Sequence, residues 1–319
     1  MGKVLVTGAY GFIGAAYCAH LAAHSVPYIG AVRARHPDES RLEIVALGDF
    51  ADADWTAPLV AEPVDCIVHL AARAHRMNDV ARESRAAYHR ENVDVTTDLL
   101  EAALAAQVRR LVFASSAKVH GEATAPGIIL RETDPLLPQD DYARSKAEAE
   151  ARVRQFGEAN GVETVILRLP LVYGPGVKAN FAALADAVRA RRILPLGAIR
   201  NQRSLLGLTN LCSALDAART HPLAADQTFL VSDGEAVSTP ELVRVIADAF
   251  AVRPRVLRWP PRLLSSLATL ALRGDAVRRL LDSFAIDNAK IRRTLEWSPS
   301  LTLAEELQRL AQARTRSPR

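Results

Sequence analysis

The chain has 319 residues, of which 49% are hydrophobic and 24% are charged, and its formal net charge is +4 at pH 7. This length allows one large or two small domains with a substantial core. Basic residues are scattered among acidic ones, and no apolar run is long enough to span a bilayer. We therefore expect neither a nucleic acid nor a membrane as a partner.

The cysteines Cys18, Cys66 and Cys212 are widely spaced and form no metal or redox motif. Such free thiols fit a reducing compartment, and the first strand-like run starts too early to leave room for a signal peptide. A cytoplasmic protein is therefore expected. His20 and His24 have the spacing of two ligands on one helix turn, but no third ligand is evident, so we expect no metal site.

The first predicted strand covers residues 3–7. It is followed by the run Gly8-Ala9-Tyr10-Gly11-Phe12-Ile13-Gly14 and by a helical stretch at 15–24. A strand, a glycine-rich turn and a helix are the context that a dinucleotide-binding site requires. Gly8 permits the tight turn, Gly11 lets the backbone approach a pyrophosphate, and Gly14 lets the helix pack on the strand. The pyrophosphate would rest on the helix N-terminus, where free N–H groups favour an anion.

The end of the second predicted strand, at 28–32, bears on which dinucleotide is bound. Enzymes that prefer NAD usually have an acidic residue there, which binds the adenosine ribose, but this chain has Val32 followed by Arg33. An arginine can bind a 2′-phosphate through charge-assisted hydrogen bonds, with Arg35 as an assistant. We therefore predict NADP as the cofactor, with NAD as the alternative. If Arg33 only stacks on the adenine, the preference would be weak.

Strands and helices continue to alternate along the chain. Strand-like runs follow at 42–47, 66–70, 111–115 and 164–169, with helical stretches notably at 93–106 and 143–159. This alternation predicts an α/β fold with a Rossmann-type doubly wound parallel sheet and helices on both faces. After Gly174 the pattern becomes irregular and rich in proline. We therefore assign residues 1–174 to an NAD(P)-binding Rossmann domain and residues 175–319 mainly to a smaller C-terminal substrate lobe.

Tyr142 and Lys146 lie four residues apart at the start of a helical stretch. This spacing puts both side chains on one helix face, one turn apart. An ammonium beside a phenol favours the phenolate and lowers the tyrosine pKa, so Tyr142 is a candidate for proton exchange near neutral pH. The spacing also occurs by chance in many helices, and it gains its meaning from the glycine-rich turn.

The run from Thr7 to Gly14 and the Tyr142/Lys146 pair, in this order and at this separation, resemble the extended short-chain dehydrogenase/reductases. More narrowly, the chain resembles their NAD-dependent epimerase/dehydratase branch, which acts on nucleotide sugars. Further matching segments are Val68-His69-Leu70-Ala71-Ala72, Asn92, Phe113-Ala114-Ser115-Ser116, Val172-Tyr173-Gly174-Pro175-Gly176 and Trp297-Ser298-Pro299. By this resemblance, residues 203–232 are expected to return to the main sheet, through strands at 205–208 and 228–231.

The resemblance implies a set of site residues. Ser116, Tyr142 and Lys146 would be catalytic. The cofactor would contact Gly8, Tyr10, Gly11, Phe12, Ile13, Gly14, Arg33, Asp49, Leu70, Ala71, Ala72, Lys146 and Pro170. The substrate would contact Lys118, Asn180, Arg203 and Arg279, with Arg278 as an alternative to the last.

The implied chemistry is hydride transfer at a sugar carbon. Tyr142 would give a proton to the carbonyl oxygen or take one from the hydroxyl, while Ser116 would hydrogen-bond the same oxygen. Lys146 would hold the tyrosine pKa down and bind the nicotinamide ribose. Ser115 is the weaker candidate, because strand alternation points it the other way.

Two departures from the family pattern narrow the activity. The dehydratases have an Asp-Glu pair after the catalytic hydroxyl, whereas this chain has Ala117 and Lys118, which argues against dehydration. Many epimerases have an asparagine where Leu171 stands. The run at 115–122 resembles a subgroup that reduces UDP-4-keto-6-deoxy-N-acetylhexosamines for surface polysaccharides. Lys118 would then face either the substrate or the solvent.

We therefore expect a nucleotide-sugar 4-ketoreductase with a UDP-sugar substrate. The nearest alternative is a nucleotide-sugar 4-epimerase of the UDP-GlcNAc or UDP-Glc type, and a non-catalytic redox sensor on the same fold is a further alternative. The family often forms homodimers through helices that correspond to 93–106 and 142–159, so a homodimer is expected here.

Overall fold

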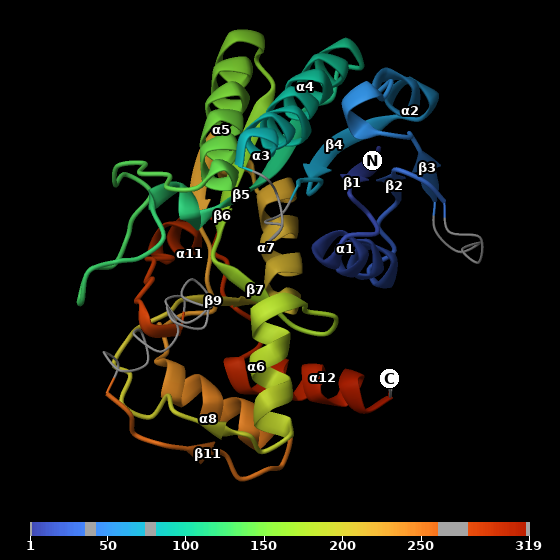
Figure 1. Cartoon of the computed structure of the whole chain (residues 1–319). Helices are drawn as coiled ribbons and strands as arrows, with labels where there is room; N and C mark the ends of the chain where they lie inside the picture. Colours follow the sequence, from blue (N-terminus) through green and yellow to red (C-terminus); the bar gives the residue numbers. More distant parts are fainter. Residues whose placement is uncertain (1, 36–42, 74–80, 261–279, 317–319) are drawn as a thin grey trace.

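The computed structural model describes residues 2–35, 43–73, 81–260 and 280–316, and Figure 1 shows its arrangement. A seven-stranded parallel sheet forms its centre, with the strand order β10-β6-β5-β4-β1-β2-β3. The strands are β1 (Lys3–Thr7), β2 (Tyr28–Val32), β3 (Ile44–Ala46), β4 (Val64–His69), β5 (Arg110–Ser116), β6 (Glu163–Leu169) and β10 (Gln227–Leu230). This is the Rossmann order, so the predicted fold class is confirmed.

Helices cover both faces of this sheet (Figure 1). The α-helices within the described residues, including those away from this sheet, are α1 (Phe12–Ala23), α2 (Thr56–Ala61), α3 (Ala81–His89), α4 (Val95–Ala105), α5 (Asp141–Asn160), α6 (Ala179–Arg189), α7 (Leu208–Thr220), α8 (Thr239–Ala249), α11 (Ala289–Thr294) and α12 (Leu303–Arg316). Because strand side chains alternate, Val4 and Val6 pack in the core with α1 and α7, whereas Leu5 packs with α2, α4 and α5. These two hydrophobic cores, one on each face, fix the main sheet and thereby the ends of its strands, where the site lies.

The helix predicted at 93–106 differs from the observed segment. A π-helical turn, η2 (Arg90–Asp94), joins α3 to α4 without a break, so the helical segment starts well before residue 93. The helix predicted at 143–159 is observed as α5, which begins after Asp140, whose carboxylate accepts a hydrogen bond from the backbone N–H of Ala143, and ends at Gly161. A carboxylate cap of this kind satisfies a free N–H group of the first helical turn.

The two strands that were expected to return to the main sheet behave differently. The segment at 228–231 does so, since β10 pairs with β6. The segment at 205–208 does not, because β9 (Leu205–Gly207) pairs with β7 (Leu171–Tyr173) in a separate two-stranded sheet. The pairing of β10 uses the outer edge of β6, so β9 has no place there. Residue 208 instead begins α7, which packs on the main sheet.

A third hydrophobic core lies between α6, α8 and α12. Beside it, β8 (Ile193–Leu194) pairs with β11 (Arg255–Val256). Glu306 of α12 is fully buried against β7 and β9, and a Cβ atom at Gly174 would lie 2.8 Å from its Oε1 atom. A side chain at position 174 would therefore collide with the docked helix.

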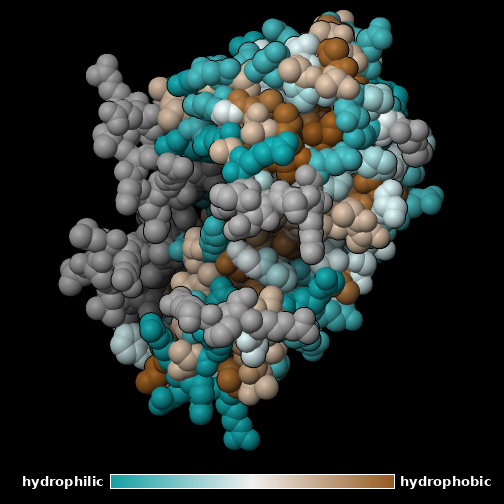
Figure 2. Space-filling view, turned by 90° about the vertical axis from the view of Figure 1, so that its right-hand side faces the viewer, coloured by the Kyte–Doolittle hydropathy of each residue, from teal (hydrophilic) through white to brown (hydrophobic). Residues whose placement is uncertain are grey.

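The surface in Figure 2 shows several separate groups of hydrophobic residues between hydrophilic ones. Such a mixture is ordinary, because polar groups alone cannot cover a folded protein. Within the described ranges, no helix combines the length and the apolar character that a membrane crossing requires.

Candidate active site

The glycine-rich turn lies at the carboxyl end of β1, beside the end of β2. The N–H groups of Gly8 and Ala9 both donate to the carbonyl oxygen of Ala31. Gly8 has a φ of +70°, and a Cβ atom at Gly14 would lie 2.1 Å from the Gly8 oxygen, so both positions require glycine. Gly14 thus packs against the turn itself. The helix α1 begins at Phe12, three residues earlier than predicted.

The first turn of α1 has the properties of an anion-binding site. Its N-cap is Gly11, which has no side chain to cap the helix, and its first turn carries no acidic residue. A Cβ atom at Gly11 would lie 3.0 Å from the Gly8 oxygen, so the turn is tightly folded and no side chain at Gly11 covers the backbone. The residues therefore fit the pyrophosphate of a dinucleotide, which such N–H groups attract.

A buried hydrogen-bond chain joins this turn to the end of β4. The N–H groups of Leu70 and Ala71 donate to the hydroxyl oxygen of Thr7 at 3.1 and 3.0 Å, and this hydroxyl lies 2.7 Å from Nδ1 of His69. Because the Thr7 oxygen accepts two N–H groups, its own proton goes to Nδ1. The His69 Nε2–H then faces the hydroxyl of Thr96 at 3.1 Å.

Burial, assisted by the charge of Lys146, lowers the pKa of His69 to about 3, which keeps the ring neutral at ordinary pH. A neutral ring donates at one nitrogen and accepts at the other, as the chain requires. The chain fixes the segment from Leu70 to Ala72, where cofactor contacts were predicted, relative to the glycine-rich turn.

The structure brings Ser116 and Tyr142 together. Ser116 is the last residue of β5, and its hydroxyl oxygen accepts the N–H of Lys118 at 3.2 Å. The side chains of Ser116 and Tyr142 are hydrogen-bonded, and this bond acts to lower the tyrosine pKa. Ser115 points to the other face, where it donates to Glu150 at 2.6 Å. The predicted choice between the two serines therefore agrees with the geometry.

The expected effect of Lys146 on the Tyr142 pKa is wrong for this structure. Burial raises the pKa of Tyr142 to about 12, against the opposing hydrogen bond from Ser116. The ammonium of Lys146 instead donates to the carbonyl oxygen of Ala114 at 2.7 Å and lies 4.3 Å from the ring centroid of Phe113. Burial lowers the pKa of Lys146 to about 7. Desolvation disfavours the charged form of both groups, and this effect outweighs their shared helix face.

Asn92 holds the helix of this pair in place. Its side-chain nitrogen donates to the hydroxyl of Ser145 at 2.9 Å, and its side-chain oxygen accepts the N–H of Arg73 at 2.7 Å. Asn92 therefore links α5 to the chain that leaves β4, and its position in the π-helical turn η2 is typical of functional sites.

Glu91, the neighbour of Asn92, was not predicted from the sequence. Its carboxylate accepts hydrogen bonds from Arg33 at 2.7 Å and from Arg73 at 2.5 Å. Arg33 also lies over the ring of Phe50, 5.9 Å from its centroid. Asp49, predicted to contact adenine, accepts the N–H of Ala51 at 3.3 Å and thereby caps the short helix η1 (Phe50–Asp52). No local sequence signal distinguishes Glu91 from other surface glutamates.

A second missed group surrounds Glu150, one turn beyond Lys146 on α5. Glu150 is fully buried, and Arg168 donates to its two oxygens at 3.0 Å from Nε and 2.7 Å from Nη2. Arg168 also lies 2.9 Å from Nε2 of His120. With Ser115, which also bonds to Glu150, the cluster ties β5, β6 and α5 together.

The predicted substrate residues are not tested by this geometry. Lys118 forms ion pairs with Asp140 and, at 3.0 Å, with Glu122. Arg203 donates to the carbonyl oxygen of Asp282 at 3.0 Å. Asn180 lies half-buried at the start of α6, and Pro170 lies between β6 and β7. Arg278 and Arg279 lie outside the described residues. All of these positions stay predictions.

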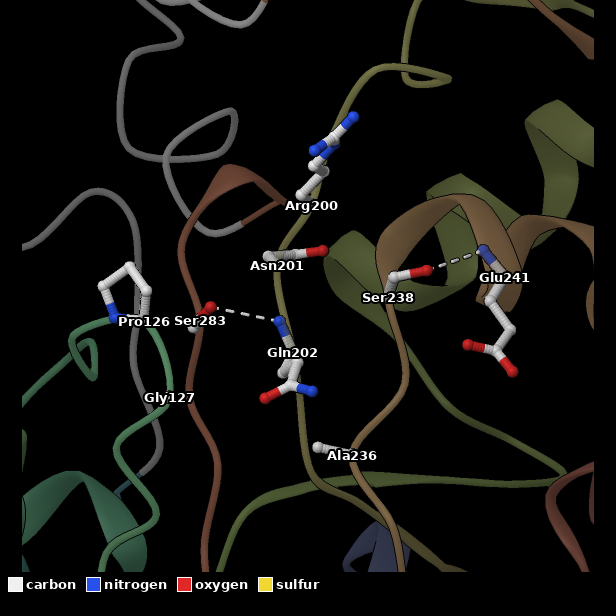
Figure 3. A pocket seen from close by; sticks show the side chains of 9 residues that line it. All are labelled: Pro126, Gly127, Arg200, Asn201, Gln202, Ala236, Ser238, Glu241 and Ser283. Carbon is white, nitrogen blue, oxygen red and sulfur yellow. Dashed lines mark hydrogen bonds between the residues drawn. The ribbon is translucent and has the colours of Figure 1, made fainter.

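A cavity of about 430 Å³ lies beside the strand-like segment that contains Arg203. Figure 3 shows its lining residues, which are Pro126, Gly127, Arg200, Asn201, Gln202, Ala236, Ser238, Glu241 and Ser283. The hydroxyls of Ser283 and Ser238 accept hydrogen bonds from the backbone N–H groups of Gln202 and Glu241 (Figure 3). None of the catalytic candidates lines this cavity, so it stands apart from the Ser116–Tyr142 pair.

Comparison with known proteins identifies the family. Residues 4–232 match the model of the NAD dependent epimerase/dehydratase family. The chain is 38% identical over 316 residues to a UDP-glucose 4-epimerase of Vibrio cholerae, which covers 98% of this chain and 95% of that protein.

Two solved structures have the same fold over nearly their whole length. UDP-N-acetylglucosamine 4-epimerase from Bacillus cereus superposes with a TM-score of 0.79 at 20% identity, covering 98% of this chain and 99% of that chain. MoeE5 in complex with UDP-glucuronic acid and NAD superposes with a TM-score of 0.78 at 26% identity, covering 99% of each chain. The chain therefore belongs to the NAD-dependent epimerase/dehydratase family and is an enzyme of the short-chain dehydrogenase/reductase type.

Proposed function

We propose that the protein is a nucleotide-sugar 4-epimerase that acts on a UDP-hexose with a nicotinamide dinucleotide. The observation that carries this proposal is the hydrogen-bonded pair of Ser116 and Tyr142 in a chain that is 38% identical, nearly end to end, to a UDP-glucose 4-epimerase. From the sequence alone, the 4-ketoreductase is the first expectation and the 4-epimerase the alternative. The full-length relative supports the 4-epimerase.

The dinucleotide, when bound, supplies the hydride acceptor and donor at the sugar C4. We propose that the glycine-rich turn and α1 hold its pyrophosphate, that Leu70, Ala71 and Ala72 line its path, and that Lys146 holds the nicotinamide ribose. Gly11 supplies the close backbone approach that such a group needs. Arg33 lies at the adenosine end.

Tyr142 is the proposed acid and base. As the hydride leaves C4, the Tyr142 oxygen, as the phenolate, would take the proton of the C4 hydroxyl. It would return this proton to the C4 oxygen when the hydride is given back to the opposite face of the C4 ketone, which inverts the configuration at C4. The Ser116 hydroxyl accepts the N–H of Lys118, so its own proton is available to donate. Donation to the Tyr142 oxygen stabilises the phenolate, consistent with the lowering effect of this bond on the tyrosine pKa.

The 4-ketoreductase is the second candidate. It is favoured by Leu171, which stands where many epimerases have an asparagine, and by the run at 115–122. Ser116, Tyr142 and Lys146 would perform the same proton transfer in one direction only. The two functions differ in whether the dinucleotide is consumed.

The test is incubation of the purified protein with UDP-glucose and UDP-GlcNAc, with and without NAD. An epimerase converts at least one of the two sugars to its C4 epimer without net change in NADH absorbance, and chromatography of the products detects this. A ketoreductase leaves both sugars unchanged and oxidises NADH or NADPH stoichiometrically with a UDP-4-keto-6-deoxy sugar. That second outcome would replace the epimerase proposal by the ketoreductase.

Tyr142→Phe tests the catalytic assignment in either case. Removing the phenol oxygen is expected to lower kcat about 10²- to 10⁴-fold, the usual contribution of a general acid–base group. Dinucleotide binding should be retained. Tyr88→Phe is a matched control, because the ring of Tyr88 lies 6.2 Å from that of Tyr142, edge to face, and has no proposed role in proton transfer. Undiminished turnover in Tyr142→Phe would remove the assignment.

We also propose a homodimer that forms through α4 and α5, and a cytoplasmic location. Sedimentation of the purified protein would distinguish a dimer from a monomer.

A further inference from the structure

Three charged side chains meet beyond the ends of β2 and β4. Arg33 follows β2, Arg73 follows the segment after β4, and Glu91 lies in η2. The Oε2 atom of Glu91 lies 2.7 Å from Nη2 of Arg33, and its Oε1 atom lies 2.5 Å from Nη1 of Arg73. Each oxygen of one carboxylate therefore holds a different arginine, and the Glu91 side chain is only 20% exposed.

This cluster lies where a Rossmann enzyme recognises the adenosine ribose. The backbone of β2 is paired to the glycine-rich turn through Ala31, two residues before Arg33. In this fold an acidic residue near the end of the second strand binds the ribose hydroxyls of NAD, whereas an arginine accommodates the 2′-phosphate of NADP. The chain has Val32 at the strand end, so the strand itself supplies no carboxylate.

Glu91 brings a carboxylate to the same place from a position 58 residues further along the chain. This carboxylate occupies one side of the Arg33 guanidinium and repels a second anion nearby. It can also accept a hydrogen bond from a ribose hydroxyl. Arg73 keeps it in place, since Arg73 is itself fixed through the bond between its backbone N–H and Asn92.

We propose that Glu91 is the residue that sets the preference for NAD over NADP, by neutralising Arg33 at the 2′ position of the adenosine ribose. This inference rests on the proposed dinucleotide-dependent function. It reverses the preference expected from Arg33 alone, because the sequence does not reveal the carboxylate that pairs with it. With Glu91 neutralised, two arginines would face a 2′-phosphate with no acid between them.

The experiment compares the Kd values of NADH and NADPH by nucleotide fluorescence, so that no sugar substrate is needed. Wild type should bind NADH more tightly. Glu91→Gln should shift the ratio of the two affinities toward NADPH by about tenfold, mainly through tighter NADPH binding, as expected when one like charge is removed from a charge-assisted site. Adding Arg33→Ala to Glu91→Gln should abolish the gain.

Glu101→Gln is the matched control. It removes the same charge from the same helical segment, ten residues further along, which is about 15 Å along a helix. The affinity ratio should not change in this variant. Glu91→Ala serves as a second variant if the glutamine disturbs Arg73, and it should shift the ratio in the same direction.

The outcomes separate the two proposals. If wild type binds both dinucleotides and Glu91→Gln and Glu91→Ala leave the affinity ratio unchanged, the role of Glu91 is overturned while the dinucleotide-dependent function stands. A wild-type preference for NADPH would likewise overturn this inference alone. If wild type binds neither dinucleotide, both proposals fail together.

Discussion

Two buried glutamates, one on α5 and one on α12, have the same exposure and different surroundings. Glu150 bonds to Ser115 and Arg168 of the main sheet, and Glu306 packs against β7 and β9; each is 0% exposed. Glu150 is held by Arg168, by Ser115 at 2.6 Å and by Arg154 at 3.1 Å. Glu306 accepts bonds from Thr209, whose backbone nitrogen lies at a long 3.4 Å, and within the described part of the chain its Oε2 atom has no hydrogen-bond partner.

The partners decide how each carboxyl titrates. Burial acts to raise the pKa of Glu150, but the hydrogen bonds and charge of Arg168 outweigh it and lower the pKa overall. Burial also raises the pKa of Glu306, and the bonds from Thr209 oppose it too weakly to reverse the shift. Burial alone therefore does not tell whether an acid is ionised, because a fixed cation beside it reverses the outcome.

The largest expected effect is the loss of the Glu150–Arg168 pair. Glu150→Ala leaves the Arg168 guanidinium, whose side chain is 4% exposed, without its carboxylate. Removing one partner of a buried pair costs about 3–5 kcal/mol, which we expect to see as a lower free energy of unfolding in urea. The double variant Glu150→Leu/Arg168→Leu should recover part of this loss. A Glu150→Ala protein as stable as wild type would show that Arg168 finds another partner.

The next effect is a difference in pH dependence between the two sites. The folded-state pKa of Glu306 is raised above the ordinary glutamate value of 4.5, so the stability it contributes is present below that pH and is lost as the pH rises through the folded-state pKa. Glu306→Gln removes this loss, so its stability relative to wild type should improve steadily from acidic to neutral pH.

Glu150 should behave in the opposite way. Its folded-state pKa is lowered, so the stability it contributes is present above the ordinary glutamate value of 4.5 and is lost as the pH falls through the folded-state pKa. The measurement is the free energy of unfolding of wild type, Glu150→Gln and Glu306→Gln across this range. If the free energies of unfolding of the two variants, relative to wild type, changed with pH in the same direction, the predicted difference between Glu150 and Glu306 would be wrong.

The smallest effect concerns the outer arginine of the Glu150 cluster. Arg154 donates to Glu150, but its side chain is 37% exposed, so solvent screens the pair. Arg154→Ala should lower the free energy of unfolding by no more than about 1 kcal/mol, as for other partly exposed ion pairs. A loss as large as that of Glu150→Ala would mean that Arg154, rather than Arg168, holds the carboxylate.

Local patterns were sufficient to predict much of the fold. The glycine-rich turn, the parallel sheet and α5 follow from spacing, turn residues and the alternation of strands and helices, which are all visible over short stretches. The pairing of β9 with β7, instead of with the main sheet, could not be predicted. The segments of β9 and β10 are both short and largely apolar, and which of them pairs with the edge of β6 depends on the tertiary structure.

The site was predicted less completely. Ser116, Tyr142 and Asn92 were found through motifs, and the structure places them in one hydrogen-bonded region. Glu91 and Glu150 were missed, because each acts through partners that are distant in sequence or carry no motif of their own. The predicted effect of Lys146 on Tyr142 failed because spacing does not reveal that both side chains are buried.

The π-helical turn η2 joins the two ends of the site through one peptide bond. Glu91 faces the arginines of the proposed adenosine end, and the next residue, Asn92, bonds to Ser145 of α5. Consecutive residues of a regular α-helix point about 100° apart. A π-helical turn contains more residues, so the side chains of two neighbours diverge less and can contact groups on the same side of the helix. A substitution that shifts the backbone at Glu91 would therefore also shift Asn92. Changes in cofactor preference and in the position of the catalytic helix would have to evolve together.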